Sequence, residues 1–248
     1  LKTVNVTGTA GETVVMAVAG VTKIDASGST GAQSWDVSGA ARQAAFTFTG
    51  GTAADRLTLA AGDFATLTAA SQLDGGAGTD TLVIKDTTPV YASLNVVKNF
   101  EVLGLGVTAT TVDAAQLTSI KSFTFGALAD ETINNLGAGS TVTTTGSNSG
   151  TVTLSAAVGN TAVGLTIGTA TSAAITVNAL VTTGLTANTL ANNGTATNVI
   201  TTLTNSDNSS FTITGAAGLT ITNALAATST GSKIDGTAMT GALSVVGS

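Results

Sequence analysis

The chain has 248 residues, of which 14 are acidic and 8 are basic, and its formal net charge is −6. It contains neither His nor Cys. This excludes His-centred catalytic triads, thiol nucleophiles and the usual zinc and copper sites, so a bound metal would have to be held by oxygen. Eight scattered cations on an acidic chain also cannot build a surface that follows phosphates, which argues against nucleic acid as a partner.

The apolar content is aliphatic, because 43% of the residues are hydrophobic and only 4% are aromatic. Disordered chains are poor in such residues, so we expect a folded protein with a sizeable core. The longest apolar stretch, residues 14–21, is much shorter than the roughly 18 to 20 residues that span a bilayer, and no membrane span is expected. No secretory signal peptide is visible after Leu1.

Short runs in which β-branched or aromatic residues alternate with polar ones recur along the chain, with Gly, Asn or Ser between them. A period of two predicts β-strands. The clearest runs are residues 4–7, 45–49, 122–125, 151–154, 174–177 and 210–214. Helical spacing is scarce, and it predicts only short turns within residues 63–71 and 113–119.

The spacing of the strands in the second half is compatible with two all-β folds. Strands around Val142, Val152, Leu165, Ile175 and Leu185 follow one another at roughly ten to twelve residues, as in β-sandwiches and in β-solenoids. The scarcity of aromatic residues and the many Gly and Asn favour the solenoid, whose thin core stacks small residues and whose turns accept positive φ. We expect a parallel β-solenoid or β-roll, with β-sandwich domains as the alternative.

Charge is distributed unevenly along the chain. From residue 122 to residue 232 the charged side chains are Asp130, Glu131 and Asp207. We therefore expect a β-roll region at residues 1–125 and a low-charge β region rich in Thr and Ala at residues 126–248.

Two segments at the start of the chain recur near its end. Residues 23–34 match residues 233–244 at an offset of 210, and residues 4–11 are echoed by residues 211–218 at an offset of 207. A second copy of a repeat therefore begins at about residue 207, which predicts a larger, modular parent protein. In both copies a Lys lies two residues before an Asp, and we expect weak surface ion pairs there.

The most specific motif lies at residues 75–83, which match the G-G-x-G-x-D-x-U-x nonapeptide of calcium-binding β-rolls. Glycines permit the tight turn, the Asp supplies a hard anionic oxygen, and the aliphatic residue starts the next strand. A degenerate copy at residues 50–58 keeps the paired Gly, Asp55 and Leu57. Two such turns stacked on each other predict a calcium site. The alternative is a glycine turn whose Asp accepts hydrogen bonds from backbone amides.

These two motifs, together with residues 99–103 and the Ile-Asp phrases at Ile24 and Ile234, resemble the RTX-type S-layer and related surface proteins of Gram-negative bacteria. The resemblance implies an extracellular, calcium-dependent β-rich lattice at the cell surface and type I secretion through an uncleaved C-terminal signal. It also implies a set of Ca²⁺ ligands, with Asp74 as an additional anion: the side chains of Asp55 and Asp80 and the carbonyls of Gly50, Thr52, Gly76 and Gly78.

We therefore expect a structural segment of a secreted, calcium-dependent, self-assembling surface-layer protein, and not an enzyme. Its partners would be identical subunits in a homo-oligomer or lattice, and cell-surface polysaccharide; Trp35, Tyr91 and Arg42 could form a sugar-stacking patch or fill a core. One alternative is a stalk or ligand-binding segment of a large RTX adhesin. The other is a β-helical polysaccharide-active enzyme, for which the chain supplies few clustered carboxylates.

Two further features have ordinary explanations. Asp130 and Glu131 are an acid pair, but adjacent strand residues point to opposite faces, so we expect a solvated turn rather than a glycosidase pair. The Thr runs at residues 141–145 and 201–204 are similar to the threonine ladders of ice-binding solenoids. They lack a strict repeat and are typical of an exposed β face with few charges.

Overall fold

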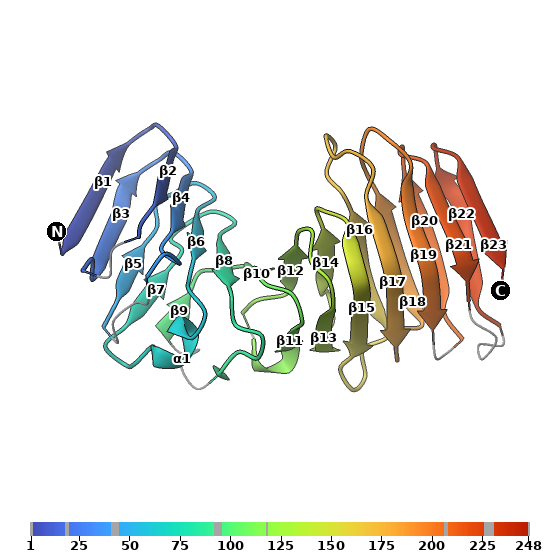
Figure 1. Ribbon diagram of the computed structural model, residues 1–248, viewed down its shortest axis with the longest axis horizontal. Helices are drawn as coiled ribbons and strands as arrows, with labels where there is room; N and C mark the ends of the chain where they lie inside the picture. Colours follow the sequence, from blue (N-terminus) through green and yellow to red (C-terminus); the bar gives the residue numbers. More distant parts are fainter. Residues whose placement is uncertain are drawn as a thin grey trace. The chain divides into compact units, whose positions relative to one another are not determined.

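The structure is a computed structural model that describes residues 2–17, 20–40, 45–91, 96–117, 119–205, 208–225 and 231–247. Nearly all of the regular structure is β, and the parallel sheets form a β-solenoid of about 10 turns (Figure 1). The prediction of a parallel β-solenoid is confirmed, and the β-sandwich alternative is wrong. Among the described residues, none of the helices has the length and apolar character needed to cross a membrane.

The chain forms two compact units, the first comprising residues 1–107 and 117–120, the second residues 108–116 and 121–248. In the first unit, successive strands alternate between two parallel sheets. One sheet contains β1 (Thr3–Gly8), β3 (Lys23–Ser29), β5 (Thr47–Thr49), β7 (Gln72–Asp74) and β9 (Val97–Lys98). The other contains β2 (Glu12–Val15), β4 (Gln33–Asp36), β6 (Arg56–Thr58), β8 (Thr81–Ile84) and β10 (Val102–Leu105).

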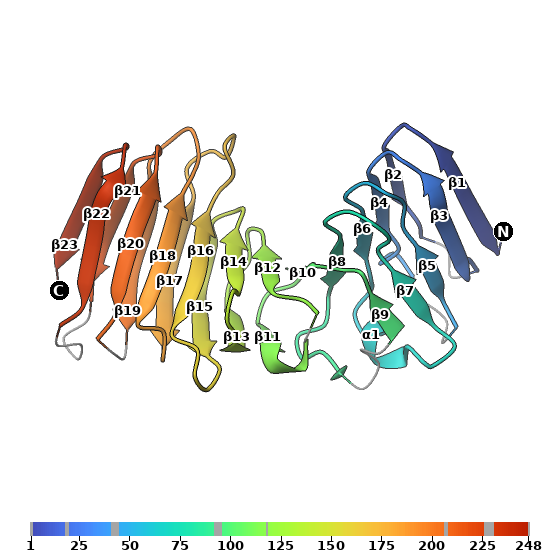
Figure 2. The same ribbon diagram turned by 180° about the vertical axis from the view of Figure 1, so that it is seen from behind.

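The second unit is built in the same way, and Figures 1 and 2 show its strands from opposite sides. One sheet contains β11 (Thr110–Asp113), β13 (Glu131–Leu136), β15 (Asn148–Ala156), β17 (Thr176–Thr183), β19 (Asn198–Asn205), β21 (Leu219–Ala224) and β23 (Leu243–Gly247). The other contains β12 (Ser122–Phe125), β14 (Thr141–Thr144), β16 (Ala162–Ile167), β18 (Ala187–Asn192), β20 (Ser210–Gly215) and β22 (Lys233–Met239).

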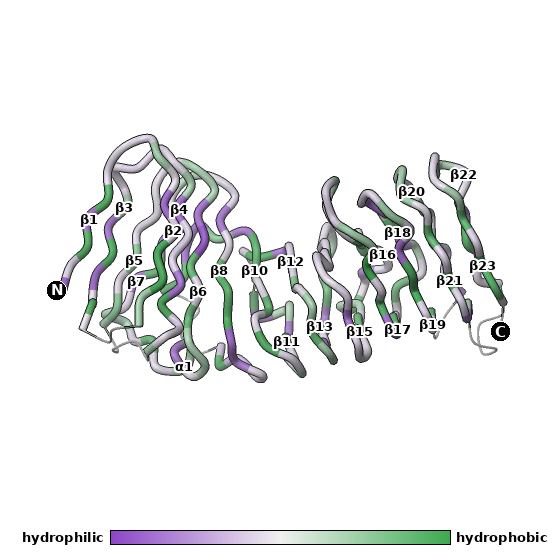
Figure 3. The backbone as a smooth tube through the Cα atoms, turned by 45° about the horizontal axis from the view of Figure 1, so that its top comes forward, coloured by the Kyte–Doolittle hydropathy of each residue, from purple (hydrophilic) through white to green (hydrophobic). Residues whose placement is uncertain are grey.

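Each turn of the solenoid therefore uses two strands, and equivalent residues of successive turns lie side by side. Trp35 pairs with Leu57, and Leu57 pairs with Leu82, which is 25 residues later. All three side chains are buried. Alternate residues along each strand point inward, so the stacked turns build continuous apolar rows between the sheets, and Figure 3 shows this alternation as changing hydropathy along the strands.

Most of the strands predicted from the period-two runs are present. The run at residues 122–125 coincides with β12, and that at residues 210–214 lies within β20. Of the run at residues 174–177, only residues 176 and 177 lie in β17, where they are the first two residues of the strand. The predicted helical turns are a short helix, α1 (Asp63–Thr66), and a 3-10 helix at Ala114–Gln116.

The repeat found in the sequence is also a structural repeat. Strand β22 pairs with β20 as β3 pairs with β1, with the same register and with the irregularity at the same place. The expected surface ion pairs are confirmed, because Lys23 Nζ lies 3.1 Å from Asp25 Oδ2, and Lys233 Nζ lies 2.9 Å from Asp235 Oδ2. Gly8 and Gly215, which end β1 and β20, both have a φ of 117°.

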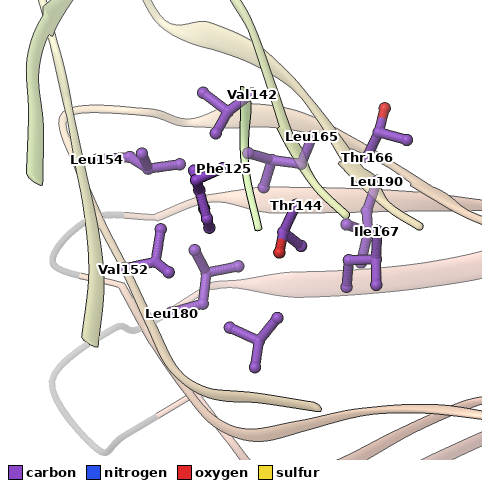
Figure 4. Close-up of a pocket in the computed structure, with 11 residues that line it drawn as sticks. Phe125, Val142, Thr144, Val152, Leu154, Leu165, Thr166, Ile167, Leu180 and Leu190 are labelled. Atoms are coloured by element: carbon purple, nitrogen blue, oxygen red, sulfur yellow. The ribbon is translucent and has the colours of Figure 1, made fainter. Parts of the chain in front are cut away.

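The core of the second unit contains a small cavity between its sheets (Figure 4). Its volume is about 30 Å³, and the side chains around it include Phe125, Val152, Leu165 and Leu180. This is enough space for about one water molecule, but a water needs polar partners that this lining scarcely offers. The cavity is a packing defect of the core, with no room for a substrate.

Candidate functional site

The two Asp residues of the glycine-rich motifs occupy the same corner of successive turns. Asp55 and Asp80 each stand immediately before a strand, and the register of those strands places them side by side. The same row continues in both directions along the first unit. We call this row the acidic corner; its members are Glu12, Gln33, Asp55, Asp80 and Glu101.

A repeated hydrogen bond connects the turns at the acidic corner. Asp55 Oδ1 accepts a hydrogen bond of 2.7 Å from the Gln33 N–H, and Asp80 Oδ1 accepts one of 2.6 Å from the Asp55 N–H. Glu101 Oε2 in turn accepts one of 2.8 Å from the Asp80 N–H. Each carboxylate therefore satisfies a backbone donor of the preceding turn, which would otherwise be left without an acceptor at the corner.

The two Asp carboxylates differ in their second oxygen. Asp55 Oδ2 accepts a hydrogen bond of 2.5 Å from the Gly51 N–H, so both of its oxygens have amide donors. Asp80 is fully buried, and its Oδ2 has no hydrogen-bond partner. Burial raises the pKa of Asp80 to about 6. The hydrogen bond from the Asp55 N–H acts in the opposite direction and lowers this pKa, whereas the negative charges of Asp55, Glu101 and Asp74 raise it further. This oxygen favours a proton or a cation beside it.

Asp74 lies at the end of β7 and shapes the turn that leads to the corner. Its Oδ1 accepts hydrogen bonds from the Gly76 N–H at 3.0 Å and from Asn99 Nδ2 at 2.8 Å. It contributes to the negative potential around Asp80.

The glycines of the two motifs let the turns stack directly on each other. A Cβ on Gly50 would overlap the Gly75 carbonyl oxygen, and one on Gly76 would overlap the Gly51 carbonyl oxygen. A Cβ on Gly78, whose φ is 139°, would lie 2.6 Å from the Ala53 oxygen. The glycines are therefore needed for close approach of backbone to backbone.

The structure thus brings Asp55 and Asp80 together, and the Asp74 charge is near enough to help raise the pKa of Asp80. The carbonyls expected from the resemblance are those of Gly50, Thr52, Gly76 and Gly78. The backbone of Gly50 lies beside the Asp55 carboxylate, since a Cβ on this glycine would lie 2.6 Å from Asp55 Oδ2. Within the part of the chain that the structure describes, no group of three or more acidic side chains has an arrangement that could hold a metal ion.

Glu101 and Gln33 belong to the corner although the sequence motifs do not include them. Neither lies in a glycine-rich turn, so the nonapeptide pattern passes over both. A signal exists nevertheless, because they lie one solenoid turn from a motif Asp: Gln33 precedes Asp55 by 22 residues, and Glu101 follows Asp80 by 21.

A second buried carboxyl lies in the other unit, and here the expectation of a solvated turn at the acid pair is wrong. Asp130 is exposed and accepts a hydrogen bond of 2.7 Å from the Thr151 N–H, but Glu131 is fully buried. Glu131 occupies a row whose next member is Val152. Burial raises the pKa of Glu131 to about 8. Thr110 on the preceding turn lowers this pKa, and the Asp130 charge raises it further. Neither carboxylate oxygen has a partner of good hydrogen-bond geometry.

The sugar-stacking patch is not formed as such. Trp35 is only 2% exposed and belongs to the core of the first unit. Tyr91 is half-buried, and Arg42 lies outside the described residues.

Over several consecutive turns of the second unit, the outward faces carry rows of small, uncharged and mostly hydroxylated residues in register. On β14, β16, β18 and β20, one row contains Thr141, Gly164, Thr189 and Thr212, and the adjacent row contains Thr143, Thr166, Ala191 and Thr214. On the opposite sheet a row from β11 to β19 contains Thr111, Thr132, Thr153, Val181 and Thr204. Gly, Ala and Val interrupt the threonines, so none of these rows is an unbroken threonine rank.

Comparison with known proteins adds no further assignment, since no family model, no curated protein and no solved structure matches this chain.

Proposed function

We propose that this chain is a structural segment of a secreted, self-assembling cell-surface layer protein that depends on calcium. The observation that carries the proposal is the row structure of the second unit, whose two outward faces present small polar side chains in register over several turns.

Such faces favour contact between subunits. Burying a charge without a partner is costly, whereas Thr, Ala and Gly lose little hydration when two flat sheets meet. Between residues 122 and 205 only Asp130 and Glu131 are charged, and Glu131 is buried. A neighbouring subunit could therefore cover these faces at a small desolvation cost.

Calcium would act in the first unit. Asp80 Oδ2 is buried without a donor, which fits a ligand for a hard cation, and calcium carboxylate sites use such oxygens. Asp55 would contribute mainly its charge, because amide donors occupy both of its oxygens. A bound cation would offset the repulsion among the carboxylates of Asp55, Asp74 and Asp80 and so stabilise the stacking of the turns.

Static light scattering of the 248-residue chain tests this function. The proposal predicts that millimolar Ca²⁺ increases the scattering mass and that a chelator reverses the increase. Asp80→Asn should abolish the calcium response, whereas Asp113→Asn, which removes a carboxylate of the other unit, should retain it. A monomer that ignores both calcium and chelator would contradict the proposal.

A further inference from the structure

A glycine interrupts the threonine row on the outer face of β14, β16 and β18, and the face is hollowed there. Gly164 stands between Thr141 and Thr189, and a Cβ on it would lie 3.4 Å from Thr141 Cγ2 and 3.8 Å from Thr189 Oγ1. The space above Gly164 belongs to an open groove of about 220 Å³, which we call the Gly164 groove. Its lining is small and uncharged and includes Gly139, Thr141, Ala162, Gly164, Ala187 and Thr189.

The turn that leads into β16 carries the most exposed large hydrophobic side chain of the described residues. Val158 has a relative exposure of 107%, so its side chain lies wholly in solvent. It stands between β15 and β16, which are paired with neighbouring strands on both of their edges. Val158 precedes Ala162, a lining residue of the groove, by four residues. The exposed valine and the groove therefore belong to one surface of the second unit.

The turn that carries Val158 is fixed by hydrogen bonds to the preceding turn of the solenoid. Asn160 Nδ2 donates to the Leu136 carbonyl at 2.8 Å and to the Gly137 carbonyl at 3.2 Å. The Asn160 N–H donates to the Ala157 carbonyl at 3.0 Å, and the Ala157 N–H donates to the Leu136 carbonyl at 2.9 Å. A side chain that is already held in place loses little conformational freedom when a partner covers it.

We propose that Val158 of one molecule enters the Gly164 groove of a second copy of this chain, and that the second copy returns the same contact. The inference rests on the proposed function and specifies one lateral contact between subunits. An exposed side chain and a groove that lie close together on one surface are self-complementary under a two-fold axis that passes between them. The contact is therefore closed and joins molecules in pairs.

The lining of the groove suits an aliphatic side chain. Its Gly and Ala residues have no side-chain polar group to dehydrate, and the Thr141 hydroxyl already donates to Ser122 Oγ at 2.9 Å. Removing an exposed valine from water is favourable in proportion to the apolar area that is covered. The two valines of a symmetric pair would contribute this gain twice.

The distribution of charge favours a second copy at this surface. The chain has a net charge of −6, so two copies repel each other where their charged regions meet. Between residues 122 and 205 only Asp130 and Glu131 are charged, and neither lines the groove. Two copies can therefore meet at the Gly164 groove without bringing like charges together.

Sedimentation velocity of the 248-residue chain tests the contact through Val158→Asp. This substitution removes the apolar side chain and would place an unpaired charge in the groove twice in each pair, so the dissociation constant of the dimer should rise by about a hundredfold. Val90→Asp is the matched control, because Val90 is an exposed valine of the first unit, and its dissociation constant should equal that of wild type.

Gly164→Thr tests the other side of the contact by filling the groove from its floor. Gly164 does not have a positive φ, and the added Cβ would meet its neighbours at ordinary contact distances, so the strand should accept the change. The dissociation constant should rise by about tenfold or more, while the thermal melting temperature of the monomer does not fall. Loss of the dimer is thereby separated from loss of the fold.

Cysteine cross-linking tests which residues meet, because the chain has no native cysteine. A mixture of Val158→Cys and Gly164→Cys molecules should form a covalent heterodimer under mild oxidation, since the contact brings the two positions within the separation that a disulfide spans. A mixture of Val90→Cys and Gly164→Cys is the control and should form none. Equal cross-linking of the two mixtures, or an unchanged dissociation constant for Val158→Asp, would overturn the inference.

The same variants separate this inference from the function on which it rests. Calcium-dependent assembly that persists unchanged in Val158→Asp and Gly164→Thr would contradict the proposed contact and leave the proposed function in place. A dimer that both substitutions weaken, but whose mass responds to neither calcium nor chelator, would support the contact and contradict the proposed function.

Discussion

At the scale of single residues, two buried carboxyls with a raised pKa make the stability of the chain depend on pH. Asp80 and Glu131 are both fully buried, one in each unit, and burial is the main cause of the raised pKa in both. A carboxyl whose pKa is higher in the folded state binds a proton on folding, so it stabilises the protein at low pH and loses that contribution as the pH rises.

For Asp80, the folded pKa of about 6 lies above the ordinary value of 3.8. Its stabilising contribution is therefore complete below pH 3.8 and disappears as the pH rises through 6. Asp80→Asn should remove this dependence and, without calcium, make the first unit more stable than wild type at pH 7. Urea unfolding at pH 4, 5.5 and 7 measures the effect. Asp55→Asn is the control and should destabilise at every pH. Asp55 accepts one backbone N–H on each of its two oxygens, whereas the side-chain amide of Asn has only one acceptor oxygen.

For Glu131, the folded pKa of about 8 lies above the ordinary value of 4.5. We expect the free energy of unfolding of the second unit to fall between pH 4.5 and pH 8, and Glu131→Gln to make it nearly constant over that window. Thermal melts followed by circular dichroism at pH 5, 6.5 and 8 test this. A wild-type melting temperature that rises over the same interval would contradict the burial of Glu131.

At the scale of the element, the turns of the first unit depend on glycines that have no room for a side chain. Gly50→Ala would place a Cβ against the Gly75 carbonyl of the next turn, so the two turns would have to separate. We expect a loss of several kcal/mol, well above the roughly 1 kcal/mol typical of point mutations. Gly126→Ala, where nothing lies within 4 Å, should change stability little. Equal effects of the two substitutions in denaturant titrations would refute the stacking argument.

The cavity in the second unit offers a test of core packing. Val152→Ile adds one methylene group to a side chain that lines it. Filling a core cavity commonly stabilises by about 0.5–2 kcal/mol, whereas the same addition in a filled core causes strain. Val112→Ile, at a fully buried valine that does not line the cavity, is the control and should not be stabilising. The midpoint of chemical unfolding distinguishes the two.

The strands and the solenoid could be predicted from the sequence because period-two alternation and the small core residues act locally. Residues 122–125 alternate strictly and form β12. The burial of Glu131 could not be predicted in this way, since it follows from the register that places Glu131 beside Val152 of the next turn. The acidic corner was predicted only at Asp55 and Asp80, because Gln33 and Glu101 join it through a spacing of one turn rather than through the motif.

At the scale of the whole molecule, one repeated geometry builds the fold in both units. Successive turns pair their strands in parallel, and the first turn of the chain and its last turn are built on the same register. The low-charge faces of the second unit are the lateral surfaces through which neighbouring subunits would meet in the proposed assembly.

The most direct test of the account is negative-stain electron microscopy of the 248-residue chain at micromolar concentration, with Ca²⁺ and again after chelation, combined with sedimentation velocity on the same samples. We predict ordered assemblies with calcium that dissociate on chelation. Dispersed monomers under both conditions would contradict the claim that this chain is a structural, self-assembling segment.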